Sequence, residues 1–178
     1  MGLLLLLLLT CATPHVPIDN TIHDIAIMES FAIGKPQQRA TWGGKPSIRI
    51  CDSTRVSVFR VKKAVAYWNM LGYEFDMVFM DYKTSCGEPR YGEIAITLPT
   101  KEMSPNHLAS TRIYTEKITA HIAKAKIFIY PKDARKQRVI EHELGHALGW
   151  QHYPQKFHIM HPNWHAGGYD ATGLRKKR

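Results

Sequence analysis

Two histidines four residues apart constrain this chain more than any other feature of its sequence. In an α-helix, residues four apart lie one turn above each other on the same face, so His142 and His146 can point at one common position. Gly149 follows, and glycine readily takes the left-handed conformation that turns a chain away from a helix end. That turn would bring His152 back towards the pair. The spacing therefore predicts a helix ending near Gly149 and a metal site made by three imidazoles.

The chemistry of these residues favours a catalytic zinc ion. Three neutral imidazoles leave one coordination position open, whereas structural zinc sites are usually closed by four protein ligands. Glu143 lies next to His142 and is placed to reach a water at the metal rather than the metal itself. A chance match to the five spaced residues, Gly149 included, has a frequency of about 0.0001 per chain of this composition. We therefore predict one Zn²⁺, bound by His142, His146 and His152, with Glu143 as the general base.

The third ligand has alternatives that the sequence leaves open. Some zinc peptidases use a glutamate downstream of the helix, but no glutamate follows Glu143, and others use an aspartate, of which only Asp170 follows. Three later histidines could also complete the site, although none has the spacing that Gly149 and His152 provide. These are His158, His161 and His165.

The remaining sequence predicts an α+β fold. Short apolar or alternating segments predict strands at residues 47–51, 75–80, 93–98, 108–114 and 123–130. Helices are expected over residues 56–71 and from a cap at Asp133 to about Gly149. In the second helix, Ile140 and Leu144 lie on the side away from the histidines and should pack on the sheet. This order predicts a mixed, mostly parallel, five-stranded twisted sheet backed by two helices.

The length of 178 residues suits one well-cored domain and is too short for two. We expect a signal peptide at residues 1–11, a lead-in segment at residues 12–45, and a single domain over residues 46–178 that carries the chemistry. The charge of +9 favours acidic surfaces, such as anionic membrane, envelope polymer or acidic protein. No helix-turn-helix, RNA-binding aromatic pattern or cysteine-rich finger accompanies that charge, so nucleic acid is not an expected partner.

The start of the chain predicts export. Seven leucines, Leu3 to Leu9, are too few to span a membrane but reach the low end of a signal-peptide apolar region. Cys11 follows almost at once and resembles the acylated cysteine of bacterial lipoproteins. The protein would then be secreted or anchored in the cell envelope. Cys51 and Cys86 remain as a pair that could form one disulfide, or stay as two free thiols in a reducing compartment.

The run from His142 to His152, followed by Met160 in Ile-Met-His-Pro, resembles the metzincin clan of zinc endopeptidases. In that clan a methionine turn lies beneath the three histidines, and Met160 matches it. The strand order and residues 169–174 are similar to the matrixin branch, so the resemblance covers roughly residues 46–178. It implies a short C-terminal subdomain with the methionine turn and a final short helix. Tyr153 stands where matrixins have serine or threonine, so the branch stays open.

The resemblance implies an endopeptidase that hydrolyses peptide bonds of proteins with a zinc-bound water activated by Glu143. In related enzymes an edge strand pairs with the extended substrate, and residues 108–113 are its counterpart here. The residues expected to contact a protein or peptide substrate are Leu108, Ala109, Ser110 and Tyr153. A monomer is expected. A different class also stays open: a lipid-anchored binding module that retains a metallopeptidase scaffold without turnover, although the intact Glu143 argues against it.

Overall fold

The computed structural model describes residues 23–24, 34–100, 103 and 107–176. The leucine run and Cys11 lie outside these ranges, so the predicted signal peptide and lipidation stay predictions. Within the described ranges, no helix is long and apolar enough to cross a membrane.

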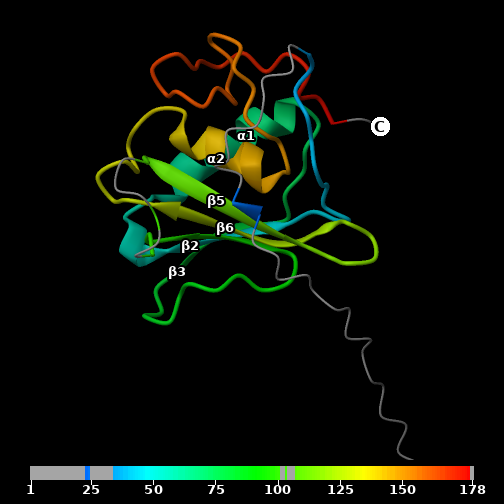
Figure 1. Cartoon of the computed structure of the whole chain (residues 1–178). Coiled ribbons are helices and arrows are strands. Elements are labelled where there is room, and N and C mark those ends of the chain that lie inside the picture. Colours follow the sequence, from blue (N-terminus) through cyan, green and yellow to red (C-terminus); the bar gives the residue numbers. More distant parts are fainter. Residues whose placement is uncertain (1–22, 25–33, 101–102, 104–106, 177–178) are drawn as a thin grey trace, which may run out of the picture.

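The described strands form one mixed sheet (Figure 1). They are β1 (His23–Asp24), β2 (Ser47–Cys51), β3 (Val78–Asp81), β4 (Glu93–Thr97), β5 (Ala109–Thr115) and β6 (Ile122–Ile129). Their order across the sheet is β1-β5-β6-β4-β2-β3. The strands β3, β2, β4 and β6 are parallel, whereas β5 is antiparallel to β6 and the two-residue β1 is antiparallel to β5. The predicted mostly parallel five-stranded sheet is confirmed, with β1 as a short addition at its edge.

Two helices, α1 (Val58–Met70) and α2 (Val139–Ala147), lie on the same side of the sheet (Figure 1). A short 3-10 turn, η1 (Asp52–Thr54), connects β2 to the segment before α1. The hydroxyl of Ser57 accepts a hydrogen bond from the Arg60 N–H and caps the start of α1. The fully buried Trp68 donates its indole N–H to the Glu141 carbonyl at 2.8 Å, which joins α1 to α2.

Isoleucines of the three central strands form the floor of the core. Branched side chains suit the pleated surface of a sheet, and burying each one contributes about 1.5–3 kcal/mol. Fully buried members are Ile48, Ile50, Ile94, Ile96, Ile127 and Ile129. Ile140 and Leu144 of α2 are buried in the same core, which confirms the predicted packing face. The opposite face of α2 is thereby left for its histidines.

The predicted start of α2 at Asp133 is wrong. The residue before the helix is Arg138, which has a φ of 68° and makes no side-chain cap. Asp133 instead lies in a turn, where its carboxylate is 2.8 Å from the Lys136 ammonium. Residues 131–138 form turns and a bend, so no helix begins at Asp133 for its side chain to cap. The guanidinium of Arg138 donates to the Trp164 carbonyl and lies over that indole ring, so contacts with a distant segment set the start of α2.

The predicted final helix is also absent from the described residues. The C-terminal part, up to residue 176, consists of turns. Gly173 has a φ of 85° inside the turn that the Leu174 N–H closes on the Ala171 carbonyl, and this left-handed conformation does not occur in an α-helix. The chain then lies against the end of α1, since the Lys176 N–H donates to the Leu71 carbonyl. Burial of Leu174 holds this extended end in place.

Gly145 of α2 lies where three parts of the core meet. A Cβ built on it would be 2.3 Å from the Met160 Sδ and 2.8 Å from the Trp68 Cζ2. Separations this short cannot hold a methyl group, and both neighbours are fully buried. Glycine therefore lets α2 approach both α1 and the segment that carries Met160.

We predict that Gly145→Ala destabilises the protein, although alanine is the better helix former. Overpacking should lower the free energy of unfolding by about 1–3 kcal/mol, measured by urea denaturation. Gly44→Ala is the matched control, because a Cβ added there would meet nothing within 4 Å beyond its chain neighbours. That control should change stability by less than about 0.5 kcal/mol. Equal stability of Gly145→Ala and the parent would contradict this packing.

Candidate metal centre

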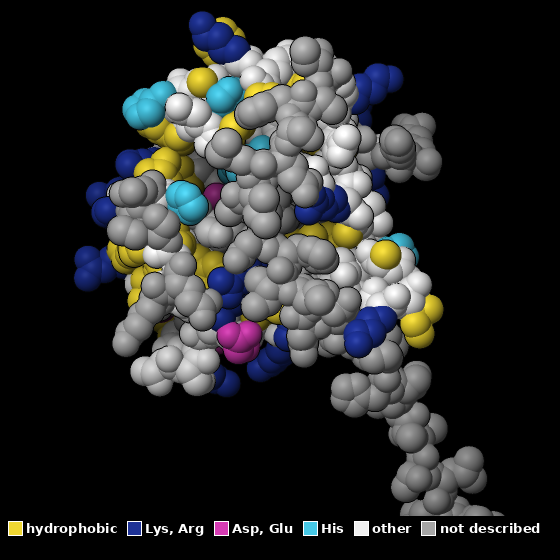
Figure 2. All heavy atoms as spheres, viewed as in Figure 1, with side chains coloured by type: hydrophobic (Ala, Val, Ile, Leu, Met, Phe, Trp, Pro, Cys, Tyr) yellow, Lys and Arg dark blue, Asp and Glu magenta, His cyan; other side chains and the backbone are white. Residues whose placement is uncertain are grey.

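The three predicted histidines come together at the end of α2. The Nε2 atom of His146 lies 3.0 Å from the Nε2 of His142 and 3.1 Å from the Nε2 of His152. Gly149 has a φ of 92°, so the predicted left-handed turn is present and returns the chain towards the helix. Figure 2 shows histidine side chains mainly in the upper half of this face, with Lys and Arg side chains around it. In the described part of the chain, these three residues form a group that could hold a metal ion.

Backbone carbonyls orient two of the imidazole rings. The Nδ1 of His142 lies 2.7 Å from the Ile159 carbonyl oxygen, and the Nδ1 of His146 lies 2.7 Å from the Trp150 carbonyl oxygen. A carbonyl can only accept, so each Nδ1 donates its proton there. Each Nε2 is then a lone-pair donor that faces the common point. This is the usual way in which proteins fix the tautomer of a metal-binding histidine.

Electrostatics keep the three rings neutral. Withdrawal from water lowers the pKa of His142 to about 4, with His152 as the next cause, and it lowers that of His146 for the same reason. The pKa of His152 is also about 4, first from desolvation and then from His161 and His107. His152 is the most exposed of the three, but its ring packs against both others, with centroids 5.3 and 4.6 Å away. Neutral imidazoles that face one another with lone pairs favour a bound cation.

The general-base candidate Glu143 is buried and has a partner that the sequence did not reveal. Burial raises the pKa of its carboxyl to about 7, and a hydrogen bond from Thr111 partly offsets that rise. The Thr111 hydroxyl is 2.6 Å from the Glu143 Oε2. Thr111 is itself buried on β5, between two apolar residues of the same face, Ala109 and Ile113. A single polar residue on the inward face of a predicted strand was the signal that could have identified it.

The turn that contains Met160 packs against α2 at Gly145, which lies between His142 and His146 in sequence. Met160 is fully buried against Gly145, and the preceding Ile159 supplies the carbonyl that orients His142. The fully buried His158 accepts a hydrogen bond from the Met160 N–H at 3.1 Å and lies 3.2 Å from the Thr172 carbonyl through its Nε2. His158 thus holds the turn rather than a metal ion.

The other alternative ligands have partners of their own. His161 accepts a hydrogen bond on its Nδ1 from the Asn163 N–H, and the His165 ring packs on Trp164. Asp170 accepts hydrogen bonds from Thr172, which are the first cause of its lowered pKa. Within the described residues, the histidine group contains none of these three.

The predicted substrate-contacting residues occupy two places. Leu108 and Ala109 are half-buried against the core, and Ser110 is half-buried at the start of β5. Only Arg112 and Ile113 of β5 pair with β1, so in the described part of the chain the segment from Ala109 to Thr111 has a strand partner on one side. Tyr153 instead packs on the His158 ring and donates its hydroxyl to the Gly34 carbonyl at 2.8 Å.

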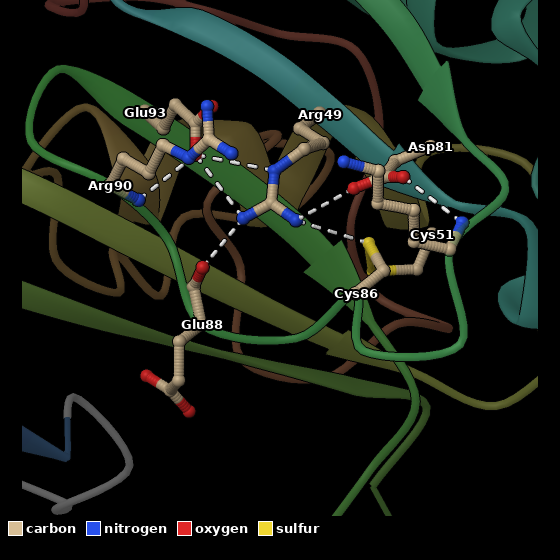
Figure 3. Close-up of polar contacts among 8 residues, drawn as sticks. Arg49, Cys51, Asp81, Cys86, Glu88, Arg90 and Glu93 are labelled. Carbon is tan, nitrogen blue, oxygen red and sulfur yellow. Dashed lines mark hydrogen bonds and ion pairs between the residues drawn. A yellow bond between two sulfur atoms is a disulfide. The ribbon is translucent and has the colours of Figure 1, made fainter.

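Cys51 and Cys86 form a disulfide, with Cα atoms 5.6 Å apart, beside a cluster of buried charges (Figure 3). Arg49 alternates with the core isoleucines of β2, so it lies on the sheet face that the helices do not cover. Its guanidinium donates to the Glu93 and Asp81 carboxylates at 3.2 Å each and to the Glu88 carbonyl. Arg49 therefore connects three strands and the loop that the disulfide holds.

Comparison of the chain with protein-family models, with curated proteins and with solved structures found no match. The resemblance to metzincins thus depends on the residues described above.

We predict that Arg49→Met is strongly destabilising, because it leaves the nearly buried Glu93 carboxylate without its cation. Removing one partner of a buried ion pair should lower the free energy of unfolding by about 3–5 kcal/mol in urea denaturation. Lys45→Met is the control, since the Lys45–Glu74 pair is exposed on both sides, at 58% and 59%. Its effect should stay below about 1 kcal/mol. Similar losses in the two variants would show that the Arg49 contacts contribute little.

We also predict that the metal-free protein loses stability as the pH falls from about 6.5 to about 4.5. In this window the unfolded histidines bind protons that the folded ones, with their lowered pKa values, do not, so acid favours unfolding. Glu143 acts in the opposite sense, because its raised pKa keeps a proton that the unfolded chain loses. The destabilisation in acid from the three histidines is expected to exceed the stabilisation from the one Glu143 carboxyl.

Urea denaturation of chelator-treated protein at several pH values measures this effect. Glu143→Gln removes the opposing group and should make the loss in acid steeper. Stability that stays constant or increases towards about pH 4.5 would contradict the low histidine pKa values.

Proposed function

We propose that this protein is a zinc-dependent endopeptidase of the metzincin type. The observation that carries the proposal is the convergence of His142, His146 and His152 beside the buried carboxyl of Glu143. Neither part suffices alone, because three histidines could serve a purely structural ion. A buried carboxyl one residue from a ligand adds a group that can accept and release a proton near neutral pH.

The donor set supports zinc over the common oxygen-binding ions. Three imidazole nitrogens suit zinc, whereas Ca²⁺ and Mg²⁺ take carboxylate, carbonyl and water oxygens. Zinc–nitrogen bonds of about 2.0 Å at tetrahedral angles place ligand nitrogens about 3.3 Å apart. The Nε2 separations of 3.0 and 3.1 Å are close to that spacing. The three histidines would hold the ion and leave a fourth position open.

Residues of this chain would carry the proton and hold the substrate. When bound, zinc supplies a Lewis acid that polarises a carbonyl and makes water more acidic. Glu143 would accept the proton of the attacking water and return it to the leaving amine. Thr111 holds the Glu143 carboxylate through its hydroxyl. Within the described residues, β5 has a strand partner on one side only from Ala109 to Thr111, and its other edge there would pair with an extended peptide.

Met160 supports the metzincin assignment, because it is buried directly beneath the ligand helix, in contact range of Gly145. The matrixin branch has weaker support, since the described C-terminal residues form turns where that branch has a helix. Export is part of the proposal. The Cys51–Cys86 disulfide favours an oxidising compartment, in agreement with the leucine run and Cys11 at the start of the chain.

The experiment compares cleavage of a proteome-derived peptide library by the parent chain and four variants, together with their zinc content. The variants are Glu143→Gln, Glu74→Gln, His152→Ala and His161→Ala. We expect chelator-sensitive cleavage by the parent. Glu143→Gln should keep its zinc and lose about 100- to 10,000-fold in activity. Glu74→Gln, which changes an exposed glutamate, should match the parent. His152→Ala should lose zinc.

Several outcomes would contradict the proposal. If Glu143→Gln cleaves as fast as the parent, Glu143 is not the base. If His152→Ala keeps its zinc and activity while His161→Ala loses both, the third ligand is His161 and not His152. A parent that binds zinc and cleaves no peptide would favour the non-catalytic binding module.

A further inference from the structure

The linker between the second and third histidines, residues 147–151, begins at a helix end that needs outside donors. The last carbonyls of any α-helix lack partners within the helix. At the end of α2, the Gly149 and Trp150 N–H groups donate to His146 and Gly145, as in a Schellman motif. The next carbonyls, those of Ala147 and Leu148, receive no hydrogen bond from that motif.

Side chains from residues 37–42 supply these donors. The indole N–H of Trp42 donates to the Ala147 carbonyl at 2.8 Å, and the Gln38 side-chain amide donates to the Leu148 carbonyl at 2.8 Å. The backbone N–H of Arg39 donates to the Gly149 carbonyl at 2.9 Å. Three successive carbonyls of the linker are therefore bonded to one short segment that is more than a hundred residues away in sequence.

The backbones of residues 37–42 and of the linker are in direct contact. A Cβ on Gly149 would be 2.0 Å from the Ala40 carbonyl oxygen, so only glycine fits there, independently of its positive φ. Gln38 and Trp150 form an antiparallel bridge, and the Gln151 N–H donates to the Gln37 carbonyl at 3.0 Å. The linker thus has a fixed partner along its length up to the residue before His152.

The linker in turn positions two metal-binding candidates. Its Trp150 carbonyl accepts from the Nδ1 of His146 and thereby aims the Nε2 of that ring. Its last residue, Gln151, leads directly into His152. Movement of the linker would therefore disturb one ring orientation and the position of one whole ligand.

We infer that residues 37–42 belong to the metal centre, with Gln38 and Trp42 as positioning residues for His146 and His152. This inference rests on the proposed function. Their hydrogen bonds hold the linker in its metal-binding conformation before an ion arrives, so less ordering is required on binding. Groups that orient metal ligands typically change metal affinity by about 10- to 100-fold when removed.

The test uses the full chain and Zn²⁺ alone. Trp42→Phe removes the indole donor and keeps an aromatic ring, and Gln38→Met removes the amide donor at similar length. The matched control is Tyr67→Phe, which removes a side-chain bond to a backbone carbonyl, from the Tyr67 hydroxyl to the Tyr169 carbonyl at 3.1 Å, and keeps the ring. We measure the zinc dissociation constant by chelator competition, the zinc release rate, and the urea stability of each metal-free variant.

We expect Trp42→Phe and Gln38→Met to bind zinc about 10- to 100-fold more weakly and to release it faster, while Tyr67→Phe keeps the affinity of the parent. In the Co²⁺-substituted variants, the visible absorption should also change, because it reports the ligand geometry. A purely structural role would lower only the metal-free stability.

Other results would contradict the inference. Zinc affinity equal to that of the parent in both test variants would overturn the inference and leave the proposed function intact. A parent that binds no zinc would overturn both. If Trp42→Phe does not fold, the half-buried Gln38 decides the question alone. None of these measurements uses peptide cleavage. A protein that binds zinc but cleaves no peptide can therefore still show whether residues 37–42 affect zinc affinity.

Discussion

Burial of one face of α2 is the constraint on which the rest of the structure depends. Ile140 and Leu144 are fully buried towards the sheet, and this fixes the rotation of the helix about its axis. His142 and His146 then have no freedom to point elsewhere, because they occupy the opposite face. Gly145 allows the same helix to lie close to Met160, whose neighbour Ile159 orients His142. Packing of apolar side chains thus determines where the polar site forms.

The two faces of the sheet are stabilised by different means. The helix-covered face uses isoleucines and the hydrogen-bonded Trp68, which need no partner of opposite charge. The other face places Arg49 among carboxylates beneath a loop held by the Cys51–Cys86 disulfide. Buried ion pairs contribute less net stability than apolar packing, but they tolerate replacement of one partner poorly. The described part of the chain places no helix on this face, and its buried charges therefore depend on one another as partners.

Features set by local spacing could be predicted from the sequence, and features set by distant contacts could not. The four-residue interval of His142 and His146 and the alternation in β4 and β6 involve neighbours along the chain, so helix, strands and the left-handed Gly149 agreed with expectation. The bond from Thr111 to Glu143 joins a strand to a helix and has no local signature beyond one polar residue. The start of α2 was wrong because Arg138 contacts Trp164. The final helix was expected by resemblance alone, and Gly173 prevents it.

The contact between residues 37–42 and the 147–151 linker also concerns the order of folding. The two hydrogen bonds from Trp42 and Gln38 close loops of 105 and 110 residues, which is among the entropically most costly steps for a chain of this length. The nine-residue α2 is too short to be stable alone, so its two histidines are aligned once Ile140 and Leu144 pack on the sheet. A partly folded chain in which α2 is packed but this contact is not yet made would therefore have two aligned histidines without a fixed position for His152. Full metal-binding capacity would arise only when the beginning and the end of the domain have met.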